Sequence, residues 1–278
     1  MQAALHEFLG EGLVTLPDGV RHAEARAVLD PGFRAEFVKG MLPTMAAVAQ
    51  ELVDTMLFKA GAGHAKDVEV EELCRRATLD VLGRTAFRFD FQALAVARGA
   101  SQGVELAAEA AQNGSLSGSA PRYADAVTLW DAVLGPAMLI AFDMKAVPHF
   151  VFPGYAGYQE GLRTFNQLVK TMITKRRAEG LHDGSKDLLT VMLQAQQQGN
   201  SLMTDKHISP DAFMPFSTGG RACIGRYMAV LEAQVVLAVL LQRLELSPPK
   251  GGAPEVSVKQ AFTLKSSQGV PVSVKPLA

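Results

Sequence analysis

The stretch FMPFSTGGRACIGRYMAVLEAQ (residues 213–234) places a single cysteine between glycines, just ahead of a long apolar segment. A cysteine acts as a nucleophile or metal ligand only as the thiolate, which needs a nearby positive charge or a helix N-terminus. Arg221 precedes Cys223 by two residues, and the apolar pattern predicts a helix from about Ile224 to Arg243. Free backbone N–H groups at that helix start would stabilise a negative sulfur. The stretch therefore offers both conditions that a functional thiolate needs.

The residues around Cys223 help to distinguish a functional cysteine from a structural one. A lone cysteine at a helix start is most often a half-buried packing residue. Here Gly219, Gly220 and Gly225 carry no side chains, which lets a broad, flat ligand approach the backbone closely. Phe216 is placed to cover the sulfur from water. The fixed spacing F-x-x-G-x-R-x-C-x-G favours the functional interpretation.

This spacing, followed by Met228, Ala229 and Glu232, resembles the haem-binding signature of the cytochrome P450 family. In that family the cysteine thiolate is the axial ligand of haem iron. The resemblance implies haem b as the cofactor and Cys223 as the metal ligand, with Arg221 as a partner of a haem propionate and of the thiolate. The cofactor-binding positions that the signature supplies are Phe216, Gly219, Arg221, Cys223 and Gly225.

A second stretch, DGVRHAEARAVLDPGF (residues 18–33), is similar to the family's helix that carries the pattern W/H-x-x-x-R. His22 and Arg26 are one helical turn apart, so both donors lie on one face and are placed to hold a haem propionate. Alone, such a pair would more often be a solvated histidine and a surface arginine. Beside the cysteine signature, we favour cofactor binding by His22 and Arg26.

The bulk composition is that of a globular protein, with 278 residues, 48% of them apolar and 20% charged, and a net charge of −1. This charge gives no reason to expect nucleic acid as a partner. Cys74 and Cys223 lie far apart in the sequence, which suits a reducing, intracellular compartment rather than a disulfide-bonded secreted domain. Cys74 lies on the apolar side of its predicted helix, so we expect it in the core. We expect no membrane anchor or signal segment, although members of the resembled family are often membrane-associated or plastid-located.

Hydrophobic periodicity predicts a mainly α fold with a small C-terminal β element, in one domain over residues 1–278. Helices are expected over residues 37–57, with an interruption at Pro43, and over residues 70–87, 158–179 and 187–198. The most apolar run, residues 229–241, is expected to be a buried core helix. After Leu246 the pattern alternates as in strands, with a hairpin turn expected at residues 266–269.

The resemblance also implies that the P450 fold is partial. The family's oxygen-side helix usually carries the pattern (A/G)-G-x-(D/E)-T, which this sequence lacks. Residues 187–205 resemble the segment before that helix and residues 209–216 the segment before the cysteine loop, so we expect a deletion junction near residues 205–209. Most of the family's N-terminal region also has no counterpart ahead of Asp18, so an N-terminal truncation is expected. Loss of the helix would leave apolar stripes exposed on its former neighbours.

A further family pattern, E-x-x-R, normally lies between the missing helix and the cysteine loop. It occurs here only earlier in the chain, at Glu72–Arg75 and at Glu160–Arg163. So short a pattern arises readily by chance. We therefore expect both occurrences to be ordinary ion pairs on helix surfaces.

Two functions follow from the resemblance. The first is that of a haem-thiolate monooxygenase, an oxidoreductase that inserts one oxygen atom from O2 into a lipophilic small molecule. It would take electrons from a reductase or a ferredoxin, and no residue is assigned a catalytic role beyond holding the cofactor. The second is that of an inactive, truncated remnant that at most binds haem or pairs through its exposed faces. The missing helix favours the inactive remnant as the function of this chain. The cysteine signature favours the monooxygenase as the function of its lineage.

Overall fold

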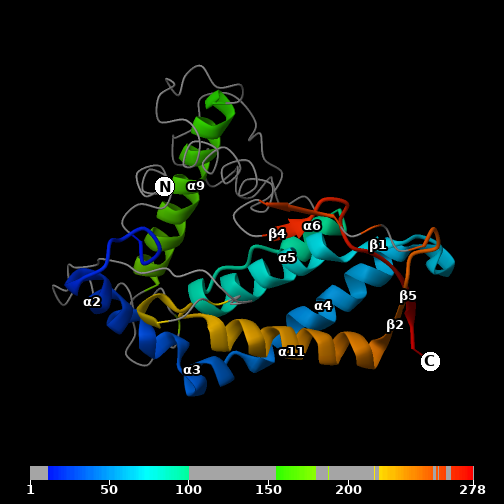
Figure 1. Ribbon diagram of the computed structural model, residues 1–278, viewed down its shortest axis with the longest axis horizontal. Coiled ribbons are helices and arrows are strands. Elements are labelled where there is room, and N and C mark those ends of the chain that lie inside the picture. The colour runs from blue at the N-terminus through cyan, green and yellow to red at the C-terminus, as the bar shows by residue number, and fades with distance from the viewer. Residues whose placement is uncertain are drawn as a thin grey trace.

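The computed structural model describes residues 12–99, 155–179, 187, 216, 219–252, 255, 257–260 and 264–277. Its α-helices are α2 (Val20–Leu29), α3 (Ala35–Lys39), α4 (Leu42–Ala60), α5 (Val70–Leu82), α6 (Ala93–Ala97), α9 (Tyr155–Ala178) and α11 (Arg226–Arg243). Shorter turns are the 3-10 segments η1 (Asp30–Phe33), η2 (Ala62–His64) and η5 (Gly219–Arg221), and the π-helical segment η3 (Gly83–Phe87). The strands are β1 (Val68–Glu69), β2 (Leu244–Ser247), β3 (Val258–Gln260), β4 (Leu264–Ser266) and β5 (Pro271–Pro276). The expected mainly α fold with a small β part is confirmed (Figure 1).

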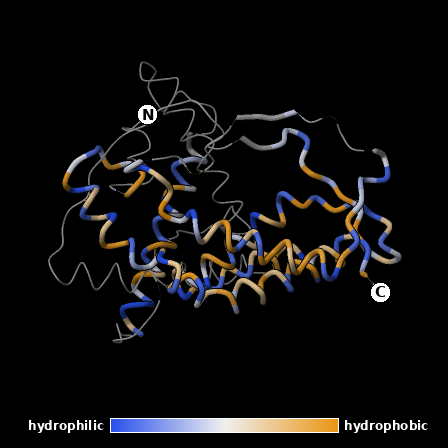
Figure 2. Tube along the Cα trace, turned by 60° about the horizontal axis from the view of Figure 1, so that its bottom comes forward, coloured by the Kyte–Doolittle hydropathy of each residue, from blue (hydrophilic) through white to orange (hydrophobic). Residues whose placement is uncertain are grey.

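Three helices form the core of the described fold. α4 packs against both α5 and α11, and the three lie together in the lower half of Figure 1. Buried residues recur every three or four positions on α4, which places them on one face; they are Met45, Val48, Leu52 and Met56. The buried face of α5 contains Leu73, Ala77 and Val81, as its periodicity predicts. Apolar residues, orange in Figure 2, follow these helices.

The break in the first predicted helix lies at Gly40 and Met41, between α3 and α4, rather than at Pro43. Pro43 instead occupies the first turn of α4, where a missing backbone N–H leaves no intrahelical bond unmade. The predicted helices over residues 70–87 and 158–179 are confirmed as α5 with η3 and as α9. Apart from Asp187, the helix expected at residues 187–198 lies outside the described residues, as does the expected deletion junction.

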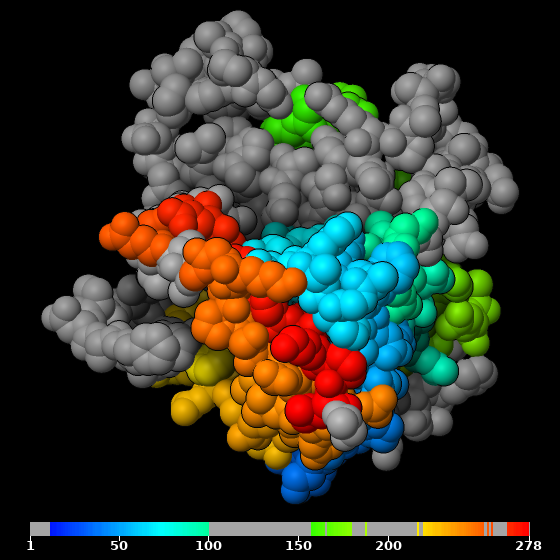
Figure 3. Space-filling view, turned by 90° about the vertical axis from the view of Figure 1, so that its right-hand side faces the viewer, coloured from blue at the N-terminus to red at the C-terminus, as the bar shows by residue number. Residues whose placement is uncertain are grey.

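β5 is the central strand of a three-stranded antiparallel sheet with the order β1-β5-β2. Leu244 of β2 lies opposite Pro276, and Val68 of β1 lies opposite Val272. Figure 3 shows β5 (red) between the orange segment that includes β2 and the cyan segment that includes β1. β3 and β4 pair with each other in a separate two-stranded sheet. The small sheet therefore joins the C-terminal strand to the start of α5 and to the end of α11.

The hairpin turn predicted at residues 266–269 is wrong, because the strands on its two sides belong to different sheets. Glu69 explains why β5 pairs with β1 rather than with β4. Its carboxylate oxygens accept the backbone N–H of Val270 at 2.9 and 2.7 Å, which holds the start of β5 against β1. The turn itself uses Gly269 at φ 78°, a left-handed conformation that glycine adopts without strain.

Two predictions about burial are also wrong. α11, which contains the apolar run at residues 229–241, packs through one side only, and its buried residues are Met228, Glu232 and Leu240. Cys74 is exposed, because it lies beside the buried row of α5 rather than on it. In both cases the apolar sequence context indicated burial that the described chain does not provide.

Candidate functional site

The loop that carries Cys223 is held by backbone hydrogen bonds. The Cys223 N–H donates to the carbonyl oxygen of Phe216 at 2.7 Å, and the Ala222 N–H donates to that of Gly219 at 3.1 Å. Gly219 has φ 66°, which a residue with a side chain adopts only with strain. The chain then turns into α11, whose N-cap residue is Gly225. Cys223 therefore lies at a helix start, as predicted.

The side chain of Cys223 is exposed. The expectation that Phe216 covers the sulfur is therefore wrong; the two residues are joined by a backbone hydrogen bond. An aromatic ring that does lie near the loop is that of Phe33 in η1. A Cβ atom added to Gly225 would lie 3.6 Å from this ring and 3.8 Å from Cys223 Sγ. These are ordinary contact distances, so packing within the chain does not require glycine there, and no position in the signature pointed to Phe33.

Arg221 is held by the chain segment that leads into α2. Its Nε atom donates to Asp18 Oδ1 at 3.1 Å. Its Nη1 and Nη2 atoms donate to the carbonyl oxygens of Leu13 and Leu16, at 3.1 and 2.6 Å. The guanidinium group thus fixes the cysteine loop to this segment. Because Asp18 is an anion, it competes with a propionate or a thiolate for the charge of Arg221.

α2 brings both of its predicted cofactor-binding residues to the cysteine loop. The Nη1 atom of Arg26 donates to the carbonyl oxygen of Gly220 at 3.4 Å. His22 is buried one turn earlier on the same helix. Both residues line a depression of about 450 Å³ together with Gly220, Asp18 and Asp30. The proximity that the resemblance implied is present, and the role of these residues in binding stays a prediction.

A buried polar cluster that the sequence reasoning missed lies on α5. Asp80 accepts the N–H groups of the first two residues of α6, at 2.8 and 3.0 Å, and burial raises the pKa of its carboxyl group. Arg76 donates to the carbonyl oxygen of Ala93 at 3.1 Å and pairs with Glu72. Glu72 was expected to pair with Arg75, which stays a prediction; it does pair with Arg76, four residues away. These contacts cap α6 against α5, so the cluster is structural.

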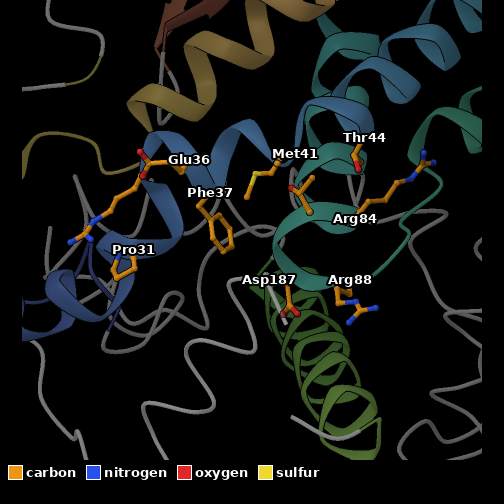
Figure 4. Close-up of a pocket in the computed structure, with 11 residues that line it drawn as sticks. Pro31, Glu36, Phe37, Met41, Thr44, Arg84, Arg88 and Asp187 are labelled. Atoms are coloured by element: carbon orange, nitrogen blue, oxygen red, sulfur yellow. The ribbon is translucent and has the colours of Figure 1, made fainter. Parts of the chain in front are cut away.

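A second cavity, of about 540 Å³, does not include the cysteine loop (Figure 4). Phe37, Met41 and Arg84 are among its lining residues. The Nη1 and Nη2 atoms of Arg84 donate to the Glu51 carboxylate at 2.6 and 3.0 Å, and its Nε atom donates to Asp90 at 3.1 Å. Because two carboxylates already neutralise this guanidinium, we assign Arg84 a structural role. The cavity adds no reactive group to the cysteine site.

The sequence profile of the family described as Cytochrome P450 matches residues 2–210 and 206–271. The two ranges together cover almost the whole chain. The chain belongs to the cytochrome P450 family. The matched ranges meet at residues 206–210, beside the deletion junction that we expect near residues 205–209; the junction itself stays a prediction.

Curated relatives match this P450 chain over a short stretch. It is 49% identical to Cytochrome P450 734A5 of Oryza sativa subsp. japonica over 70 residues, which are 24% of this chain and 12% of that protein. It is 43% identical to Cytochrome P450 4Z1 of Homo sapiens over 68 residues, or 24% of this chain and 13% of that protein. It is 42% identical to Taurochenodeoxycholic 6 alpha-hydroxylase of Sus scrofa over 66 residues, again 24% and 13%. The matched stretch spans only about an eighth of the length of these relatives.

Two further features of the described residues bear on the site and its surroundings. None of the described helices combines the length and the apolarity needed to cross a membrane. Among the described residues, no group of three or more His, Cys, Asp and Glu side chains is arranged to hold a metal ion. Ligation of haem iron by a single thiolate does not need such a group.

Proposed function

We propose that this chain binds haem b, with the thiolate of Cys223 as the axial ligand of the iron. The observation that carries the proposal is the hydrogen bond from Arg26 to the carbonyl oxygen of Gly220, at 3.4 Å. These residues are 194 positions apart in the sequence. The bond therefore supports one shared site for the two segments that resemble the family's haem contacts.

The depression is lined by Gly220 of the cysteine loop but not by Cys223. The loop and the depression side by side offer the donors that haem needs. Cys223 is exposed, so a ligand can reach its side chain. A Cβ atom added to Gly220 would meet nothing within 4 Å, which leaves open space above the loop. The guanidinium of Arg26 matches the carboxylate of a propionate in charge and hydrogen bonding. Haem with a thiolate ligand supplies, when bound, the capacity to activate dioxygen.

We further propose that the chemistry is that of a monooxygenase, in which one oxygen atom of O2 is inserted into a lipophilic small molecule. Electrons would come from a reductase or a ferredoxin. Family membership supports this reaction class, and one relative is itself named a hydroxylase. The part assigned to this chain's own residues is to ligate the iron through Cys223 and to orient the propionates through Arg26 and His22.

A second candidate function is that of an inactive remnant that at most binds haem. The sequence lacks the (A/G)-G-x-(D/E)-T pattern that the family uses to handle protons on the oxygen side. In addition, the side chain of Cys223 is exposed, and solvent access alters the redox potential of a metal centre. Both observations favour haem binding without turnover.

A carbon monoxide difference spectrum of the reduced, haem-supplemented chain tests haem ligation. We expect a thiolate-type Soret band for the unaltered chain and for Cys74→Ser, and no such band for Cys223→Ser. Cys74 is the matched control because it is also an exposed cysteine. A band that persists in Cys223→Ser, with helical content unchanged, would refute the assignment of the ligand.

Oxygen uptake with a reductase then separates the two candidate functions. Uptake above the level of Cys223→Ser, in the presence of a lipophilic substrate, is the result expected of a monooxygenase. A thiolate-type band without uptake would identify the chain as a haem-binding remnant.

A further inference from the structure

α11 is apolar around almost its whole circumference. A helix of this kind is normally buried on all sides, because each apolar face gains free energy by leaving water. One side of α11 meets this expectation, since Met228 and Leu240 are buried against the core and Leu231, Val235 and Val239 pack partly against it. The opposite side has no such cover within the described chain.

The uncovered side of α11 carries large apolar residues in a regular row. Their exposed fractions are 41% for Tyr227, 41% for Val230, 55% for Leu237 and 62% for Leu241. With Gln234, which is also exposed, they follow one another at steps of three, four, three and four residues. We call these five residues the α11 seam. Steps of three and four place residues along a single stripe of a helix, which is the arrangement by which two helices pack together.

The seam is accessible, as the exposed fractions of its residues show, and α11 itself lies at an edge of the described fold. The helix lies along the lower side of the molecule in Figure 1, and Figure 2 turns that side toward the viewer. The seam extends over about 21 Å, since fourteen residue steps of about 1.5 Å separate its ends. It is therefore long enough for a neighbouring helix to pack along four turns.

We propose that the seam is the contact by which two copies of this chain form a two-fold symmetric dimer. A contact between identical patches requires that the patch be complementary to itself. Between Arg226 and Arg243 the exposed residues of α11 carry no charge, so identical copies meet without like-charge repulsion along the seam. A two-fold axis at the level of Gln234 places the two amides opposite each other.

Gln234 is the residue that favours a second copy over an unrelated partner. A side-chain amide is both donor and acceptor, so two facing glutamines satisfy each other. Off the axis, the same amide would be buried against apolar groups and would lose its hydrogen bonds to water without replacement. A single polar residue in an apolar helix seam fixes the register of pairing in this way.

The dimer is expected to be weak. A contact through one helix from each copy falls in the lower class of interfaces, below about 1,200 Å² in total. Association must also offset the lost freedom of the two copies, so we expect a dissociation constant on the order of micromolar. The proposal does not depend on haem binding, and the two can fail separately.

Sedimentation equilibrium of the full chain under reducing conditions tests the contact. We expect a reversible monomer–dimer equilibrium, with at least tenfold weaker association in Leu237→Glu. The matched control is Val20→Glu, which changes an even more exposed apolar residue (71%) on α2; it should leave the dissociation constant unchanged. Far-ultraviolet circular dichroism confirms that each variant is folded.

Cross-linking tests the register. In a Cys74→Ser and Cys223→Ser background, Gln234→Cys is expected to form a disulfide-linked dimer on mild oxidation, since the two positions face each other at the axis. Gln242→Cys, exposed but outside the seam, is the control and should cross-link far less. Equal cross-linking at both positions would overturn the proposed register.

Three results would overturn the proposal. One is an unaltered chain that remains monomeric up to about 100 µM, far above a micromolar dissociation constant. Another is a dimer that survives Leu237→Glu. The third is a monomer that floats with phosphatidylcholine vesicles and loses this ability in Leu237→Glu, which would assign the seam to a lipid surface.

Discussion

The Nε atom of Arg221 lies 3.1 Å from Asp18 Oδ1, so the cation two residues before Cys223 is paired with the segment that leads into α2. The signature led us to expect that this cation would serve a propionate and the thiolate. In the observed pairing it also fixes the cysteine loop to the rest of the chain, together with the bonds to Leu13 and Leu16. The affinity for haem is therefore expected to depend on the charge of Asp18.

Asp18→Asn is expected to slow haem dissociation about threefold to tenfold, because it frees Arg221 to pair with a propionate. The loss of a partly exposed ion pair should lower the free energy of unfolding by no more than about 1 kcal/mol. Transfer of haem to an excess of apomyoglobin measures the dissociation rate. Asp30→Asn is the control, since Asp30 lines the same depression but belongs to η1, outside the segment that holds Arg221. Equal effects of the two variants would point to general charge in the depression instead.

Arg26→Ala is expected to speed haem loss about tenfold, the factor that one charge-assisted hydrogen bond of moderate strength supplies. His22→Ala should have a smaller effect on haem loss and a larger one on folding, because His22 is buried. Arg34→Ala removes an exposed cation outside the depression and serves as the control. The same haem-transfer measurement decides the order, and a larger effect of His22→Ala would contradict the assignment to Arg26.

The local part of the site could be predicted from the sequence. The cysteine, the glycines and the helix that follows them lie within a few residues of one another, so their spacing encodes their arrangement. The pair His22 and Arg26 is local in the same sense, because one helical turn separates the two residues. The contacts that join these segments are long-range, and neither Asp18 as the partner of Arg221 nor Phe33 beside Gly225 follows from any local pattern.

The wrong predictions share a physical cause, which is that burial and strand pairing depend on distant parts of the chain. The apolar composition of α11 indicated burial, yet composition does not reveal whether a helix is covered by its own chain or by another. Ser266 and Gly269 form a plausible hairpin turn, but β5 pairs with β1, a strand of only two residues that no periodic pattern can reveal. The long helices α4, α5 and α9 were predictable because a period of 3.6 persists over several turns.

Gly269→Ala is expected to lower the free energy of unfolding by about 2 kcal/mol, through strain at a left-handed residue and a steric clash. The added Cβ atom would lie 2.2 Å from Glu69 Oε2, which would force the Glu69 carboxylate away from the N–H of Val270. Gly251→Ala is the control, since its Cβ atom would meet nothing within 4 Å, and it should stay within about 0.5 kcal/mol. Urea unfolding measures both variants. Equal stabilities would show that the contact between the Glu69 carboxylate and the Val270 N–H contributes little to the free energy of unfolding.

Glu232→Gln is expected to stabilise the fold at neutral pH and not at acid pH. Glu232 lies buried between α11 and the core, and burial raises the pKa of its carboxyl group, while a hydrogen bond with Thr78 lowers it to a lesser extent. As pH rises above about 4.3, the carboxyl group ionises first in the unfolded chain. The folded state then holds more protons than the unfolded state, so the free energy of unfolding falls with rising pH until the folded group has ionised as well.

Glutamine remains neutral and removes this loss, so Glu232→Gln should gain about 1 kcal/mol near pH 8 and little near pH 4. Urea unfolding at both pH values measures the difference. Burial also raises the pKa of Asp80, so this group makes the free energy of unfolding fall with rising pH as well. Because Asp80 is present in both the unaltered chain and Glu232→Gln, its effect cancels in the comparison. Glu245→Gln, on the exposed side of β2, is the control and should show no such gain. If Glu232→Gln gave the same gain at both pH values, the stabilisation would come from packing or hydrogen bonding rather than from relief of a buried charge.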